Sequence, residues 1–218
     1  QTGPTSGFEI PAFEGQSDET EGFFRFVTSD GPGRGYIRLE NGSCKTIFTQ
    51  LDSLTNTPNL SAGAAEPYVL IVGGGQGGLA LGAQLQDLGV PYLIVDKYPN
   101  VGDQWCSRYE SLVLHDPVWY DHMPFKPFPS DWPVFTPKDQ MGDWLEAYAA
   151  DLNLNLSTNT SLVRAQYNQV SDQWTAQIDQ NGVRKTIKPT HLVMALGLSG
   201  FPKIPSFKGQ DIFKGPQF

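Results

Sequence analysis

The residues from Pro67 to Asp96, PYVLIVGGGQGGLALGAQLQDLGVPYLIVD, decide the fold of this chain. They open with an apolar run, Tyr68 to Val72, whose length and β-branched residues predict a buried parallel strand. A helical pattern of leucines and small residues follows the glycines and ends at Gly89. A second apolar run, Tyr92 to Val95, leads into Asp96. This order of strand, glycine turn, helix, strand and acid predicts an α/β, Rossmann-like domain with a parallel sheet.

The glycine turn satisfies the dinucleotide fingerprint Gly-x-Gly-x-x-Gly with Gly73, Gly75 and Gly78. Gly73 permits the tight turn off the strand, and Gly75 lets the backbone approach a pyrophosphate at the positive end of the helix. Gly78 allows the helix to pack closely on the sheet. Asp96 is expected to accept hydrogen bonds from both ribose hydroxyls of an adenosine. Because an acid there disfavours a 2′-phosphate, FAD or NAD is favoured over NADP at this site.

Composition excludes several classes of protein. The 218 residues are 39% hydrophobic and carry a net charge of −8, with no basic patch for nucleic acid or anionic lipid. The apolar runs are too short to span a membrane. The two cysteines, Cys44 and Cys106, have no metal-ligand spacing, so we expect no metal site and two free thiols. No signal peptide is recognised, although the chain starts at Gln1, and we expect a cytoplasmic protein.

Three strand-like runs precede the glycine turn, at residues 23–28, 35–40 and 44–51. Asn41-Gly42 between the last two is a strong hairpin signal. An antiparallel meander of this size is too small to bury its own face, so we interpret it as the end of a larger sheet domain. Residues 56–66 are small, polar and unpatterned, which is typical of a linker.

The segment after Asp96 contains further structural signals. Residues 117–137 are rich in proline and aromatic residues, which predicts an ordered loop held by aromatic packing. Thr136 is the expected N-cap of a following helix, with Pro137 at its first position. Residues 152–156 alternate as a strand would. Residues 161–187 then predict a second antiparallel meander with a tight turn at Asn181-Gly182, and residues 191–197 a third buried strand.

Three short motifs carry a more specific signal: Gln104-Trp105, Arg108-Tyr109 and Leu114-His115-Asp116-Pro117. They resemble the class B flavoprotein monooxygenases, above all the YUCCA-like and fungal members. That resemblance implies that Gln104 and Trp105 line an FAD crevice and that Leu114 and His115 lie near the isoalloxazine edge. It also implies that Val163 contacts the adenine, and that Ala195 and Gly197 belong to an Ala-x-Gly motif at the end of the FAD domain. The predicted cofactor-binding residues are thus Gly73, Gly75, Gln76, Gly78, Asp96, Lys97, Gln104, Trp105, Leu114, His115, Val163, Ala195 and Gly197.

The resemblance also divides the chain into parts. Residues 1–55 resemble the C-terminal part of an NTF2-like domain, residues 56–66 are the linker, and residues 67–218 resemble an FAD-binding domain that stops before an NADPH-binding domain. Phe213 and Gly215 match the first half of the family's Phe-x-Gly-x-x-x-His fingerprint. Two departures stand out, since Cys106 replaces the family's arginine and Leu196 replaces its threonine. Arg108 remains open as a flavin-contacting cation or as a structural partner of Asp103 or Glu110.

The function implied by the resemblance is FAD- and NADPH-dependent monooxygenation. In that family NADPH reduces FAD, the reduced flavin adds dioxygen to give a C4a-peroxyflavin, and oxygen passes to a small-molecule substrate. No side chain is required as a nucleophile, so no catalytic residue is predicted, and we expect the fragment alone to be inactive toward NADPH. Two alternatives remain: a flavoprotein reductase of the two-dinucleotide-binding type, and a non-catalytic flavin or dinucleotide module acting as a scaffold or sensor. The oligomeric state is not predicted.

Overall fold

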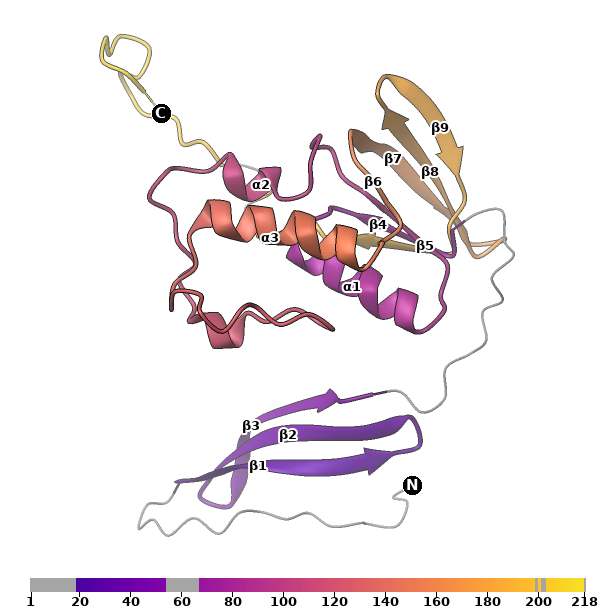
Figure 1. Ribbon diagram of the computed structural model, residues 1–218, viewed down its shortest axis with the longest axis vertical. Helices are drawn as coiled ribbons and strands as arrows, with labels where there is room; N and C mark the ends of the chain where they lie inside the picture. The colour runs from indigo at the N-terminus through magenta and orange to yellow at the C-terminus, as the bar shows by residue number, and fades with distance from the viewer. Residues whose placement is uncertain (1–18, 54–66, 199, 201–202, 218) are drawn as a thin grey trace. The chain divides into compact units, whose positions relative to one another are not determined.

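The computed structural model of this chain describes residues 19–53, 67–198, 200 and 203–217 (Figure 1). The chain divides into two compact units, Gln1–Asn59 and Leu60–Phe218. The expected linker at residues 56–66 lies outside the described residues. Across the described part of the chain, none of the helices combines the length and the apolar character needed to cross a membrane.

The first unit contains a three-stranded antiparallel sheet of β1 (Glu19–Thr28), β2 (Gly31–Glu40) and β3 (Ser43–Leu51), in that order. This confirms the three predicted strands. Asn41 and Gly42 both have positive φ, 50° and 73°, as the predicted tight turn requires. Phe24 lies opposite Gly35 and covers it, so that a Cβ on Gly35 would overlap the phenyl ring. An aromatic side chain thus fills the space that the strand glycine leaves.

The second unit is built on a four-stranded parallel sheet. Its strands are β4 (Val69–Val72), β5 (Tyr92–Val95), β6 (Leu156–Ser157) and β10 (His191–Met194), in the order β10-β4-β5-β6. All four residues of β4 are buried, which confirms the predicted buried parallel strand. Because parallel strands end at the same edge, the glycine turn after β4 and Asp96 after β5 lie together there.

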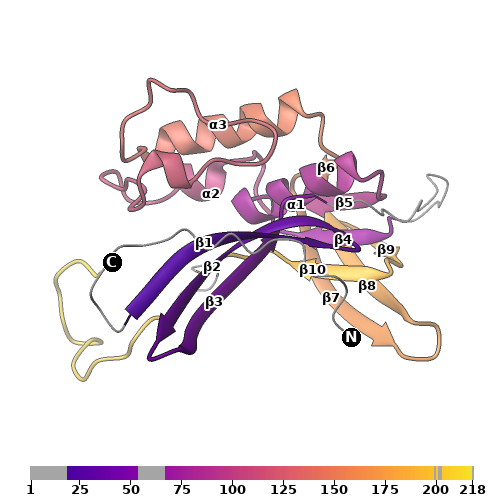
Figure 2. The ribbon, with the colours of Figure 1, turned by 90° about the horizontal axis from the view of Figure 1, so that it is seen from below.

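Two different layers cover the faces of this sheet (Figure 2). Helices α1 (Gln76–Asp87) and α3 (Lys138–Asp151) pack on one face, where Ile71 and Ile94 meet Leu79 and Met141 in the main core. The other face, with Leu70, Val72 and Val95, packs against Ala176 of the meander. That meander consists of β7 (Thr160–Asn168), β8 (Gln173–Gln180) and β9 (Val183–Ile187), as predicted.

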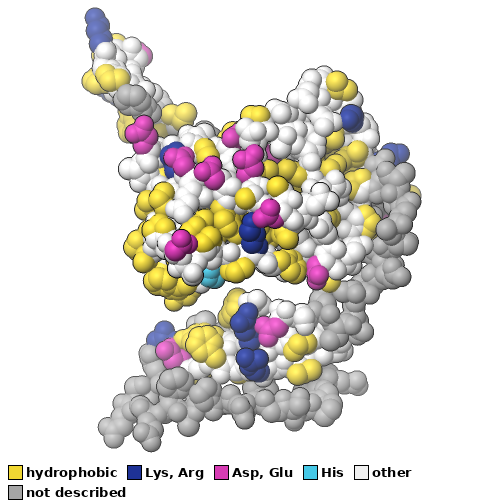
Figure 3. All heavy atoms as spheres, viewed as in Figure 1, with side chains coloured by type: hydrophobic (Ala, Val, Ile, Leu, Met, Phe, Trp, Pro, Cys, Tyr) yellow, Lys and Arg dark blue, Asp and Glu magenta, His cyan; other side chains and the backbone are white. Residues whose placement is uncertain are grey.

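The loop between β5 and α3 contains the single turn α2 (Asp103–Cys106) and the 3-10 turn η1 (Val118–Tyr120). Aromatic packing holds its second half, since Phe128 stacks on Trp132 and meets the edge of Trp144 of α3. This confirms the predicted ordered loop. Hydrophobic atoms gather on the surface over this part of the unit (Figure 3). The exposed large apolar side chains of the loop include Trp119, Tyr120, Phe125, Val134 and Phe135.

Three local predictions are wrong at least in part. The strand predicted at residues 191–197 ends at Met194, and none of its residues is buried, because β10 lies at the edge of the sheet. Of residues 152–156 only Leu156 lies in a strand, β6, because α3 continues to Asp151 and the Leu152 and Leu154 N–H groups donate to carbonyls of its last turn. Asn153 adopts a positive φ of 48°, as a helix-terminating residue does. Thr136 is not the N-cap of α3; Pro137 occupies that position, and the Thr136 hydroxyl is buried without a hydrogen-bond partner. The helix therefore starts one residue later than expected.

Candidate functional site

The glycine turn after β4 has the backbone geometry that its sequence demands. Gly73 has a φ of 112°, a conformation that residues with a side chain rarely adopt, and its N–H donates to the Val95 carbonyl at 2.8 Å. A Cβ on Gly73 would overlap the Ala195 carbonyl oxygen. A Cβ on Gly78 would overlap the Gly73 carbonyl oxygen and touch Ile71. Both positions therefore require glycine for the strand, turn and helix to approach as closely as they do.

Gly75 differs from these two glycines because the space beside it is open. It is the N-cap of α1 and has no side-chain cap, and the nearest atom to a Cβ there would be Gln104 Oε1 at 3.6 Å. The first N–H groups of any α-helix lack partners within the helix and carry its positive dipole end. Since α1 also has no acidic residue in its first turn, this end of the helix suits an anionic ligand.

Asp96 lies directly beside the turn and both of its carboxylate oxygens accept hydrogen bonds. Oδ2 accepts from the Gly74 N–H at 2.5 Å, and Oδ1 accepts from the Tyr98 N–H at 2.8 Å. The side chain remains half-buried rather than sealed. Each carboxylate oxygen can accept more than one hydrogen bond, so ribose hydroxyls can be added without displacing these contacts.

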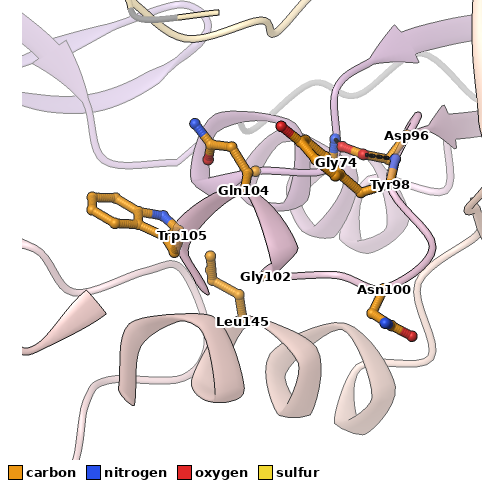
Figure 4. Close-up of a pocket in the computed structure, with 9 residues that line it drawn as sticks. Gly74, Asp96, Tyr98, Asn100, Gly102, Gln104, Trp105 and Leu145 are labelled. Carbon is orange, nitrogen blue, oxygen red and sulfur yellow. Dashed lines mark hydrogen bonds between the residues drawn. The ribbon is translucent and has the colours of Figure 1, made fainter. Parts of the chain in front are cut away.

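A pocket joins these groups to α2 (Figure 4). About 200 Å³ of space free of protein atoms lies within it, part of which is open solvent. Gln104 and Trp105 project from α2 and Leu145 from α3, while the Asp96 to Gly74 hydrogen bond lies at the other end. The lining residues are Gly74, Gly75, Asp96, Tyr98, Asn100, Gly102, Gln104, Trp105 and Leu145.

Four of the predicted cofactor residues therefore meet in one pocket: Gly75, Asp96, Gln104 and Trp105. Others lie next to it in the chain or the fold without lining it. Gln76 is the first residue of α1, and the Ala195 carbonyl contacts the Gly73 backbone position. Gly73 and Gly78 act through packing, and Lys97 is an exposed cation over the Tyr98 ring at 5.0 Å.

The remaining predicted residues lie outside this pocket. Leu114 is 6% exposed and belongs to the main core, whereas the His115 side chain is 95% exposed and its Nε2 lies 3.5 Å from Asp116. Val163 is exposed on β7, and Gly197 follows β10 with a φ of 72°. Their assignment to the flavin stays a prediction.

Sequence reasoning missed Gly74, Tyr98, Asn100, Gly102 and Leu145 as lining residues. Gly74 stands inside the fingerprint, so the run of glycines was a usable signal for it. Leu145 is a buried leucine on the core-facing side of α3, and its local pattern is that of any core residue. Its second role depends on which helix packs against α2, and no local pattern encodes that.

Arg108 has a defined place in the structure. Its guanidinium lies over the Trp105 ring at 4.8 Å from the ring centre, a cation–π contact. Within the described ranges no ion pair joins it to Asp103 or Glu110. The cation therefore supports the tryptophan of the pocket from outside.

Cys106 has an environment that suppresses its reactivity. Burial raises the pKa of its thiol, and the carboxylates of Asp139 and Asp143 raise this pKa further. The neighbouring Lys138 opposes them but does not cancel the effect. Because only the thiolate is a nucleophile, a raised pKa keeps Cys106 protonated and inert at neutral pH. The other cysteine, Cys44, is also free.

The parallel sheet, the glycine turn at the start of α1 and the acid after β5 define a dinucleotide-binding α/β fold. Comparisons with known proteins narrow this class. No family model matches the chain. The probable indole-3-pyruvate monooxygenase YUCCA4 of Arabidopsis thaliana is 33% identical over 151 residues, 69% of this chain and 36% of that protein. The homologues of this chain are thus YUCCA flavin monooxygenases, together with a CzcO-like oxidoreductase of Geobacillus kaustophilus that is 34% identical over 139 residues, 64% of this chain and 38% of that protein.

Solved structures agree on the fold. A mutant flavin monooxygenase from Stenotrophomonas maltophilia matches with a TM-score of 0.60 and 23% identity, over 69% of this chain and 44% of that one. OTEMO, in a complex with FAD and NADP, matches with a TM-score of 0.57 and 22% identity, over 71% of this chain and 30% of that one. At these identities the structural likeness establishes the fold alone. The chain spans about a third of the length of the curated relatives it matches, 36% of YUCCA4.

Proposed function

We propose that the second unit binds FAD and is the FAD-binding portion of an NADPH-dependent flavoprotein monooxygenase. The observation that carries this proposal is the convergence of Gly75 at the start of α1, Asp96, and the pair Gln104 and Trp105 on one pocket. The relatives, among them indole-3-pyruvate monooxygenases, support the same class of reaction. For this chain we propose a small organic substrate and dioxygen, without a more specific identity.

The residues present fit FAD. The open space beside Gly75 suits a pyrophosphate, which would accept hydrogen bonds from the first N–H groups of α1. The carboxylate of Asp96 would accept from the ribose hydroxyls and repel a 2′-phosphate, which favours FAD over NADP in this pocket. Gln104 offers an amide that can donate and accept, and Trp105 offers a planar apolar wall.

When bound, FAD supplies the redox chemistry, and the residues of this chain bind it, orient it and exclude water. We assign no catalytic residue. Cys106 stays protonated at neutral pH and has no second cysteine in the second unit with which to exchange disulfides. This argues against the reductase alternative that uses a cysteine pair at the flavin. Leu114 and His115 near the flavin edge remain part of the proposal.

The proposal is tested by titrating the purified chain with FAD, FMN and NADP⁺. We expect FAD to bind, since its adenosine and pyrophosphate meet the pocket. Its visible absorption spectrum should also be perturbed, because the isoalloxazine is proposed to lie near Leu114 and His115. FMN lacks the adenosine and NADP⁺ carries the 2′-phosphate, so both should bind more weakly. Equal binding of FAD and NADP⁺, or no binding of FAD, would contradict the assignment of this pocket.

NADPH is proposed as the reductant of the whole protein, with its site largely outside this chain. The sequence contains one Gly-x-Gly-x-x-Gly turn, and the proposal assigns that turn to FAD. The 218-residue chain loaded with FAD should therefore not oxidise NADPH steadily. Steady NADPH consumption by this chain would refute that division of sites.

A non-catalytic flavin module is the second candidate, and two departures from the family pattern favour it. Cys106 and Leu196 stand where the family carries arginine and threonine. The two candidates differ in the longer parent protein. NADPH that bleaches the bound flavin under anaerobic conditions supports the monooxygenase, whereas flavin that stays oxidised supports the scaffold or sensor.

For the first unit we propose the C-terminal part of an NTF2-like domain, joined by the linker at residues 56–66. Its three antiparallel strands support this. The apolar side chains of Phe23, Ile47 and Phe48 are largely exposed, as expected for part of a larger sheet domain whose remaining residues would cover them. A structure of the longer protein tests the assignment. For location we propose the cytoplasm, where free thiols such as Cys44 and Cys106 persist; cell fractionation tests it.

A further inference from the structure

We propose that Lys138 is a positioning residue that holds α2, and with it Gln104 and Trp105, at the dinucleotide pocket. The consequence for flavin rests on the proposed function, whereas the mechanical role of Lys138 does not. Lys138 is not among the cofactor-binding residues that the sequence predicted.

The burial of Lys138 is the first observation. Its side chain is only 7% exposed, although it carries an ammonium group. A buried charge is costly unless hydrogen bonds compensate it. Nζ donates to the Cys106 carbonyl oxygen at 2.8 Å and to Asp139 Oδ1 at 2.6 Å. These two acceptors compensate the buried charge of the ammonium. One of them, the Cys106 carbonyl, belongs to another element, α2.

The position of Lys138 within α3 is the second observation. It is the first residue of that helix, where the dipole disfavours a cation. The ammonium is therefore not placed to stabilise α3. It is instead placed at the carbonyl end of α2, where a cation is favoured and where the last carbonyls lack partners within the helix.

The size of α2 is the third observation. A helix of four residues, Asp103–Cys106, has no stability of its own and must be held from outside. Its N-terminal end is held by contact between Gly102 and Gly142 of α3, where a Cβ on either glycine would press on the other residue's backbone. Lys138 holds the opposite end. These two contacts, one at each end of α2, flank the residues that line the pocket, Gln104 and Trp105.

The backbone of Lys138 is itself held in place by hydrogen bonding. The Lys138 N–H donates to the Leu112 carbonyl oxygen at 3.0 Å, next to a bridge between Val113 and Pro137. The lysine backbone therefore does not move independently of the loop that follows α2. Loss of the ammonium would release the C-terminal end of α2 while leaving α3 and the sheet in place.

The test compares Lys138→Met, Lys138→Arg and the control Lys185→Met. Lys185 is exposed, and among the contacts described its ammonium donates only to the Gln180 side chain. Hydrogen–deuterium exchange without ligand is the first readout. The amides of Trp105, Cys106 and Ser107 donate within α2 and report on it directly. Lys138→Met should exchange these amides faster while those of β4 and α1 stay unchanged. Lys138→Arg, which keeps a cation and N–H donors, should restore part of the protection.

FAD affinity is the second readout. Lys138→Met should raise the Kd for FAD about tenfold, because FAD binding must then order the end of α2 that the lost charge-assisted hydrogen bond held, and should change the visible spectrum of the bound flavin. Lys185→Met should change neither. Should Lys138→Met not fold, Lys138→Gln takes its place, because its polar amide is tolerated beside the Cys106 carbonyl and Asp139 while its shorter, neutral side chain still removes the ammonium contact.

The outcomes separate the two claims. Wild-type exchange in α2 for a folded Lys138→Met or Lys138→Gln protein overturns the positioning role, whatever happens to its melting temperature. Faster exchange confined to α2 supports the positioning role, whether or not the wild-type protein binds FAD. Absence of FAD binding by the wild-type protein would contradict the proposed function and leave the positioning role standing. Faster exchange with unchanged FAD affinity overturns the link between α2 and the cofactor.

Discussion

The Asp96 carboxylate accepts a hydrogen bond from the Gly74 N–H at 2.5 Å, so the acid expected to meet a ribose also shapes the glycine turn. The two groups are contributed by the loops after β4 and β5, which end at the same edge of the sheet. Organisation of the turn, and the proposed recognition of the sugar, thus depend on one side chain. A substitution of Asp96 changes both.

Asp96→Asn should therefore weaken FAD binding without creating NADP⁺ binding. The amide keeps one acceptor oxygen, so either the Gly74 N–H or the Tyr98 N–H loses its partner. We expect about a tenfold rise in the Kd for FAD together with a lower melting temperature. Asp87→Asn, at the exposed end of α1, is the matched control. A variant that gains NADP⁺ affinity with unchanged stability would contradict the structural role.

Two adjacent glycines of α1 should respond to alanine in opposite directions. A Cβ on Gly78 would overlap the Gly73 carbonyl oxygen, whereas a Cβ on Gly77 would meet nothing within 4 Å. Gly78→Ala should lower the free energy of unfolding by about 3 kcal/mol. Gly77→Ala should raise it by about 0.5 to 1 kcal/mol, since alanine is the better helix former. Urea denaturation measures both, and equal effects would refute the packing argument.

Gly142 and Cys106 should be energetically coupled. A Cβ on Gly142 would overlap the Cys106 sulfur atom, so Gly142→Ala should destabilise the protein by about 2 kcal/mol. In a Cys106→Ala background the sulfur is absent and the penalty should shrink by about 1 kcal/mol. The Gly102 carbonyl, 3.2 Å from the same Cβ position, accounts for the remainder. Strict additivity in a double-mutant cycle would count against this contact.

Alkaline pH should destabilise the second unit through Tyr148. Burial raises the pKa of its hydroxyl to about 12, and the nearby Tyr92 contributes to the shift. The hydroxyl donates to the Pro124 carbonyl at 2.9 Å in the folded state. In the unfolded chain the pKa is about 10, so the contribution is complete below that pH and is lost as the pH rises toward 12.

The measurement is the free energy of unfolding from pH 9 to 12. Tyr148→Phe should flatten its decline above pH 10, because the folded state then no longer holds that proton. Tyr120→Phe is the control, since Tyr120 is 78% exposed. An identical pH profile for wild type and Tyr148→Phe would rule out this residue as the source.

Local features of the chain were readable from its sequence for physical reasons. Gly73 needs a positive φ, and Asn41-Gly42 and Asn181-Gly182 need two positive values in succession, so each restricts the backbone by itself. The strand at Val69–Val72 follows from an unbroken apolar run that must be buried on both faces. The alternation at residues 152–156 misled because two of its leucines are the terminating turn of α3, where helix capping sets the spacing.

By itself the sequence determined the parallel sheet, the glycine turn and the acid beside it, since these depend on neighbouring residues and a fixed crossover. Only the tertiary structure decided what closes the pocket. Leu145 and Lys138 come from a helix that begins more than 30 residues after α2, the segment that carries Gln104 and Trp105. Such contacts bring together residues whose local patterns are those of an ordinary core face or a solvated charge. Their role arises from packing, which sequence periodicity does not encode.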